Sequence, residues 1–222
     1  MNVTRTLLRV HRKIALWIAA IAVVIASVGL VLVTQAGPMR YSFWLVIAGS
    51  IAKYWTLTVG IMMISMHFRT FVGNGVTRRE FLVAVAGAGL MIAAGFAIAV
   101  TAGHALESAV LGLTDQRGPG YPSVVDGDLG RVFPVSLGYF TSGVLIAAGF
   151  HRFRPWIGVA LIIPGAVPVA VADGLLGFNE RGEQADRLAY LPALAISLVV
   201  TAAAAAAIWA LMRDVPVRRA AG

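Results

Sequence analysis

Long apolar runs separated by mostly short polar segments extend along the whole chain. Each run is about as long as the roughly 17 to 25 residues that a helix needs to cross a bilayer. The pattern therefore predicts an all-α, polytopic membrane protein whose residues 1–222 form a single transmembrane domain. The six transmembrane helices are expected at residues 14–33, 42–66, 81–101, 132–150, 156–172 and 188–212.

Composition supports this class. Hydrophobic residues make up 59% of the chain and charged residues 13%, whereas soluble domains are about half apolar and a quarter charged. No stretch remains for a separate soluble domain. The chain contains no cysteine, which excludes disulfides and thiolate chemistry.

The basic residues are distributed unevenly between the two predicted membrane faces. The face with both termini holds twelve of the eighteen Lys and Arg residues, the other face holds five, and Lys53 lies within the second span. The positive-inside rule therefore places both termini in the cytoplasm. Membrane topology accounts for the net charge of +8 without nucleic acid. The preference for arginine over lysine indicates a high-GC bacterium, and hence a bacterial plasma membrane protein.

Two flanking segments have recognisable patterns. In residues 1–13, Val3, Leu7 and Val10 follow helical spacing with arginines on another face, which predicts an amphipathic segment at the membrane lipid surface. A frayed basic tail is the alternative. Residues 102–131 are expected to form the main external loop, with a short interfacial helix at 104–113 and turns beyond Thr114.

Motifs for catalysis are absent from the sequence. Neither lysine follows a glycine, so the chain has no phosphate-binding loop for ATP, and it has no HExxH or GxSxG motif. Its four histidines lie in four different loops or termini without metal-ligand spacing, and are interpreted as ordinary loop residues. The sequence therefore predicts no enzyme activity, cofactor or metal site in this chain.

The polar segment 67–81 between the second and third spans contains the clearest local motif. Gly73, Asn74 and Gly75 tolerate the left-handed conformation that ends a helix, and Thr77 to Glu80 (TRRE) has the pattern of a capping box that opens the next one. This predicts a helical corner. The corner either serves as a docking site or simply connects two spans.

The string FVGNGVTRREF resembles the cytoplasmic segment between the second and third spans of permease subunits of type-2 ATP-binding-cassette (ABC) exporters. The matching pattern is Gly75, Val76, Thr77, Arg78, Arg79, Glu80 and Phe81, and the six-span layout agrees. The resemblance implies a cytoplasmic coupling segment that contacts a separate cassette ATPase subunit, in which ATP and magnesium would be bound. Phe71, Val72 and Val76 would fill a groove of the ATPase. Gly75 and Thr77 would also contact the ATPase, and Arg78, Arg79 and Glu80 would fix the register.

The same resemblance implies a second permease copy or a paired permease, because six spans are too few for the usual pathway. One feature differs from the family. Many members have their main external elaboration between spans 5 and 6, whereas the longest predicted loop here joins spans 3 and 4.

Two other classes of function remain open: a secondary transporter that uses intramembrane charges, and a nonenzymatic membrane anchor or assembly protein. Lys53 and Asp173 are the charged residues expected within spans. Helical rise places Lys53 about 16 Å below the outer end of its span and Asp173 roughly 10 Å shallower. They either pair or act separately, with Lys53 reaching toward the interface and Asp173 ending span 5. Proton coupling usually requires several buried acidic groups, and Asp173 is the one acidic residue near the predicted membrane interior. The secondary transporter is therefore disfavoured.

Overall fold

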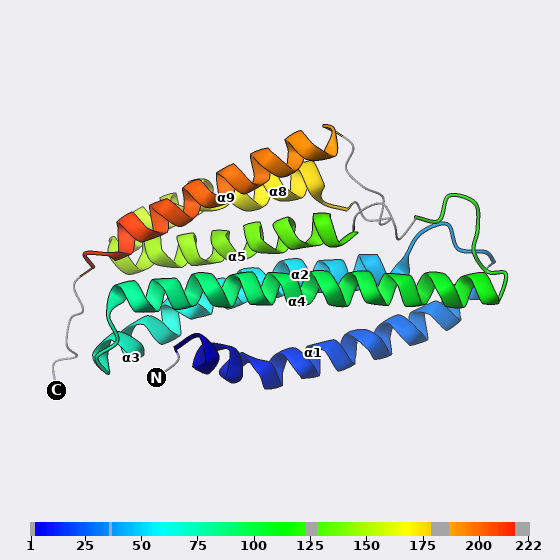
Figure 1. Ribbon diagram of the computed structural model, residues 1–222, viewed down its shortest axis with the longest axis horizontal. Coiled ribbons are helices and arrows are strands. Elements are labelled where there is room, and N and C mark those ends of the chain that lie inside the picture. The colour runs from blue at the N-terminus through cyan, green and yellow to red at the C-terminus, as the bar shows by residue number, and fades with distance from the viewer. Residues whose placement is uncertain (1–2, 36, 123–127, 179–186, 216–222) are drawn as a thin grey trace.

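A computed structural model describes residues 3–35, 37–122, 128–178 and 187–215, without the side chains of residues 10–15 and 33. Its elements are helical, which confirms the all-α class (Figure 1). In chain order they are α1 (Val3–Thr34), α2 (Phe43–Met62), the π-helical turn η1 (Met63–His67), α3 (Phe68–Gly73), α4 (Arg78–Leu113), α5 (Asp128–Arg152), α6 (Pro155–Ala160), α7 (Ile162–Gly165), α8 (Val167–Leu176) and α9 (Tyr190–Met212).

Among the described residues, four helices are long and apolar enough to cross a membrane: Phe43–Gly73, Arg78–Leu113, Asp128–Arg152 and Tyr190–Met212. By length and composition they indicate a multi-pass membrane protein. The first and fifth predicted spans correspond to the shorter apolar segments Leu16–Leu32 and Ile162–Leu176. The structure thus shows four of the six predicted spans as candidate membrane helices.

Helix α5 lies at the centre of the bundle, between α2 and α4 on one side and α8 and α9 on the other, with α1 on the outer side of α2 and α4 (Figure 1). Its close contact with α2 depends on two glycines. A Cβ at Gly60 would collide with the carbonyl oxygen of Phe140, and a Cβ at Gly143 would collide with that of Leu57. Such small residues let transmembrane backbones approach closely.

The predicted corner is present. After α2, the π-helical turn and α3 continue the helix to Gly73, and Gly75 then adopts a φ of +89°. Thr77 caps α4 by accepting a hydrogen bond from the backbone N–H of Glu80, and the Glu80 carboxylate accepts one from the backbone N–H of Thr77. The predicted capping box is confirmed.

Two predicted boundaries differ from the structure. Helix α4 continues without a break to Leu113, so residues 102–113 belong to it and the described part of the loop is 114–122. The fifth predicted span is divided into α6, α7 and α8. Pro164 and Pro168 lack the backbone N–H that a continuous helix would use. Pro155 lies in the first turn of α6.

The N-terminal segment is helical from Val3 and continuous with α1. Its Leu7 is fully buried in an apolar cluster that includes Phe68, Phe81 and Met212, so this side chain packs on the protein itself. The start of α1, α3 and the end of α9 lie at the same end of the bundle, called the corner end below (Figure 1). The predicted loop positions 180–186 and the C-terminal Arg218 and Arg219 lie outside the described residues.

Candidate functional site

The corner between α3 and α4 has a buried underside and an exposed tip. Phe71 is 8% exposed and its ring lies 5.9 Å from that of Phe81, within the apolar cluster at the corner end. Val72 and Val76 also pack against this cluster. In the structure these three apolar side chains pack against the protein's own bundle, and their contact with a partner's groove stays a prediction. The exposed part of the corner includes Gly73, Asn74, Gly75, Thr77, Arg79 and Glu80.

Two arginines connect the corner end to the end of α9. Arg78 Nη1 donates a hydrogen bond to the carbonyl oxygen of Arg213 at 3.2 Å, and Arg152 Nη1 donates one to that of Leu211 at 2.8 Å. The last carbonyls of a helix carry partial negative charge, which favours arginine there. Arg79 and Arg154 instead lie exposed at the surface. The start of α4 and the end of α5 are thereby both tied to α9.

Lys53 and Asp173, from α2 and α8, are brought together in the structure. Lys53 Nζ lies 2.6 Å from Asp173 Oδ1, and their side chains are 15% and 34% exposed. The Tyr139 hydroxyl of α5 donates to Asp173 Oδ2 at 3.2 Å. These side chains line a cavity of about 210 Å³ between the three helices. The expected difference in depth does not separate the charges, because the region before Asp173 is a chain of short helices rather than one straight span.

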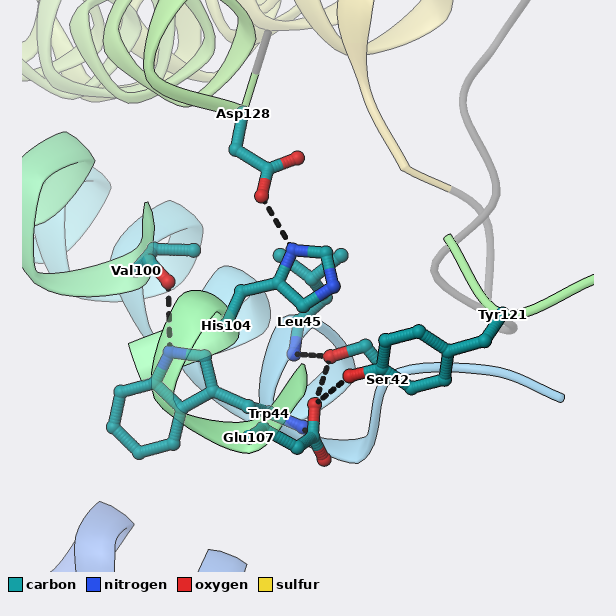
Figure 2. Close-up of polar contacts among 8 residues, drawn as sticks. All are labelled: Ser42, Trp44, Leu45, Val100, His104, Glu107, Tyr121 and Asp128. Carbon is teal, nitrogen blue, oxygen red and sulfur yellow. Dashed lines mark hydrogen bonds and ion pairs between the residues drawn. The ribbon is translucent and has the colours of Figure 1, made fainter. Parts of the chain in front are cut away.

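A second polar cluster lies at the end of the bundle opposite the corner and includes Ser42, Glu107 and Tyr121 (Figure 2). Glu107, on α4, is 7% exposed, and its carboxylate accepts hydrogen bonds from the backbone N–H groups of Phe43 and Trp44 at 3.0 and 3.1 Å. It also accepts a hydrogen bond from the Ser42 hydroxyl. Glu107 therefore caps α2 from a different helix, where the positive end of the helix dipole stabilises its charge.

Tyr121 closes this cluster from the loop after α4. Its hydroxyl donates to Glu107 Oε2 at 2.8 Å (Figure 2). Burial of the phenol, together with the neighbouring Glu107 carboxylate, raises the pKa of Tyr121 well above its ordinary value. The hydroxyl therefore stays protonated and acts as a hydrogen-bond donor that holds the loop against α4.

His104 and Asp128 form a buried pair beside this cluster, joining α4 to the start of α5 (Figure 2). His104 Nδ1 lies 2.5 Å from Asp128 Oδ2, and the side chains are 0% and 1% exposed. The other ring nitrogen, Nε2, is buried without a hydrogen-bond partner in the described part of the chain. The expectation that His104 is an ordinary loop residue is therefore wrong. Glu107 and Asp128 also add buried acidic groups that the sequence analysis did not anticipate.

The two polar sites and the corner are thus separate features of one bundle. Within the described residues, no three His, Asp or Glu side chains gather in a way that could hold a metal ion. The sequence did contain a signal for the missed residues. Val100, His104, Glu107 and Leu111 recur at intervals of four, three and four, so they occupy one buried face of a continuous helix.

Comparisons with known proteins give no relative: no family model, no curated protein and no solved structure matches the chain.

Proposed function

We propose that this chain is a six-span permease subunit of a type-2 ABC exporter, with both termini in the cytoplasm. The observation that carries the proposal is the corner at 67–81. It is a capped turn, supported from below by buried phenylalanines, whose exposed tip includes four residues of the recurring pattern, Gly75, Thr77, Arg79 and Glu80. In this account the corner contacts a cassette ATPase subunit, and a second copy or a paired permease completes the pathway.

Six spans follow if α1 and the series α6–α8 also cross the bilayer. Leu16–Leu32 is an apolar segment of 17 residues, which is close to the minimum of about 17 for a span. Broken helices are tolerated at membrane depth where protein covers the interrupted backbone, and α8 packs against α5 and α9. The excess of basic residues at the corner end then places that end in the cytoplasm.

Mechanical coupling is the physical reason why such a corner suits an ATP-driven transporter. The helix runs from α2 through η1 and α3 almost without interruption, and only four residues separate the end of α3 from the start of α4. Arg78 and Arg152 tie this end to α9. A push on the tip would therefore tilt α2 and α4 and pull on α9, rather than bend a loose loop.

A second candidate, a secondary transporter that uses intramembrane charges, is favoured by specific observations. Lys53 and Asp173 form an ion pair within the bundle, and His104 and Asp128 form a buried hydrogen-bonded pair. Ionisable groups at membrane depth commonly mark ion or substrate pathways. This alternative gives no reason for the capped corner. A nonenzymatic anchor would need neither the corner nor these pairs.

The exposed arginines provide a matched test of the first proposal. Arg79→Glu reverses a charge at the tip, and Arg154→Glu reverses an equally exposed charge at the neighbouring connection between α5 and α6. Both variants leave the ties to α9 intact. Each is coexpressed with any cassette ATPase that a neighbouring gene encodes, and copurification and ATP hydrolysis are measured.

We expect Arg79→Glu to weaken copurification or uncouple hydrolysis, and Arg154→Glu to retain both. Equal and negligible effects of the two variants would contradict docking at the corner and leave it as a connector between spans.

A further inference from the structure

Helix α1 contacts the bundle at its two ends. At the corner end, Leu7 is fully buried in the apolar cluster. At the other end, Gly29 lies so close to Phe43 that a Cβ would overlap the ring. Between Leu16 and Leu32, only Ala22 and Ala26 are buried. The middle of α1 is therefore held beside α2 and α4 without packing tightly against them.

The space left along α1 forms two adjoining cavities, of about 560 Å³ toward the corner end and about 520 Å³ beyond it. Ala19, Phe96 and Ala99 line both, so the two form one continuous crevice. Along α4 the lining runs from Ile92 to Val110, about 27 Å at the helical rise of 1.5 Å per residue. This is close to the roughly 30 Å thickness of a bilayer's hydrocarbon core.

The two ends of the crevice differ in charge. Arg5 and Arg9 line the cavity at the corner end, and no acidic side chain of the described residues lines it with them. Glu107 lines the far cavity, but its carboxylate is already engaged with the N-terminus of α2. The crevice therefore combines a long apolar wall with a cationic mouth.

We propose that this crevice binds one anionic phospholipid, with its phosphate at Arg5 and Arg9 and an acyl chain along Phe96 and Ala99. Arginine side chains pair well with phosphate oxygens, and an apolar crevice open to a bilayer favours a hydrocarbon chain. A neutral lipid offers the two guanidinium groups no net charge. A second copy of this chain, inserted in the same orientation, would bring its own arginines to the same end. The bound lipid would then fill the gap between α1 and the bundle.

The headgroup is tested with the purified full chain in detergent, by adding phosphatidylglycerol or phosphatidylcholine and measuring thermal unfolding and binding. The wild type should be stabilised more by phosphatidylglycerol. Arg5→Ser with Arg9→Ser should abolish this preference, with a loss of affinity of roughly fivefold per arginine. The control, Arg69→Ser with Arg154→Ser, removes two exposed arginines from the same end and should keep the preference.

The acyl chain is tested by filling the crevice. Ala99→Phe should reduce the binding of both lipids, whereas Ala105→Phe, on the same helix but outside the crevice lining, should not. Brominated phosphatidylglycerol gives a readout that does not depend on these variants. Trp55 lines the part of the crevice toward the corner end and Trp44 lines the far part, so the saturable part of the tryptophan quenching should fall in Trp55→Phe.

Three outcomes would overturn the proposal: equal binding of the two lipids by the wild type, unchanged quenching in Trp55→Phe, or a disulfide-linked dimer formed through Ala19→Cys. The last would show that a second copy occupies the crevice. None of these measurements involves the ATPase partner, so failure here leaves the proposed coupling role untouched.

Discussion

The ion pair between Lys53 and Asp173 makes a quantitative prediction about stability. Removing one member of a buried ion pair costs about 3–5 kcal/mol, because the other charge is stranded. The side chains of Lys53 and Asp173 are 15% and 34% exposed. This partial exposure reduces the expected cost of Lys53→Met to about 2 kcal/mol. Asp173→Leu should cost about 3 kcal/mol, because the Tyr139 hydroxyl also loses its acceptor.

The double variant should cost only about 1 kcal/mol rather than the additive value of about 5 kcal/mol, because it strands no charge and leaves only the Tyr139 hydroxyl without its acceptor. The free energy of unfolding is measured in mixed micelles by titration with sodium dodecyl sulfate, with helicity as the signal. Arg213 and Asp214 form an ion pair with side chains 64% and 67% exposed, so its double-mutant cycle should give a coupling close to zero. Additive losses for Lys53 and Asp173 would refute the pairing and leave Lys53 as an independent residue of the cavity.

Three further predictions concern packing, the buried pair and topology. Gly60→Ala should destabilise the protein by about 1–3 kcal/mol, because its Cβ would meet the Phe140 carbonyl. The control Gly49→Ala should be neutral, because a Cβ at that position has open space. Equal unfolding midpoints for the two variants would contradict the close contact of α2 and α5. His104→Leu should cost about 3 kcal/mol or more, because it leaves Asp128 buried without its partner. In the same unfolding assay, adding Asp128→Leu should recover part of this loss of stability. No recovery would argue against the pair. In whole cells, an impermeant maleimide should label Pro119→Cys but not Asn74→Cys, since the proposed topology places these residues on opposite sides; the reverse pattern would invert the orientation.

The corner could be predicted because its determinants are local. The capping box needs only the four residues from Thr77 to Glu80, and the turn before it needs the freedom of Gly75. The direction in which Phe71 points could not be predicted in this way. An apolar side chain on a short cytoplasmic helix fits a partner's groove and the protein's own core equally well, and only the positions of Phe68 and Phe81 decide between them.

The extent of α4 and the polar cluster were missed because their determinants are distant in the sequence. His104 and Glu107 have the polarity of a loop, but their partners Asp128 and Ser42 lie 24 and 65 residues away. The pairing of Lys53 with Asp173 was left open for a related reason. Depth was counted along one straight helix, and the short helices α6, α7 and α8 do not follow that count.

Contact between the corner and an ATPase subunit is the central claim, and site-directed crosslinking tests it most directly. The chain has no cysteine, so Arg79→Cys and Arg154→Cys each introduce a single reactive thiol at an exposed position. With cysteines introduced around the groove of the coexpressed ATPase, a short bifunctional maleimide should join the ATPase to residue 79 and not to residue 154, and the yield should change when ATP is added. Equal crosslinking at both positions, or none at residue 79 in a complex that copurifies, would contradict the claim.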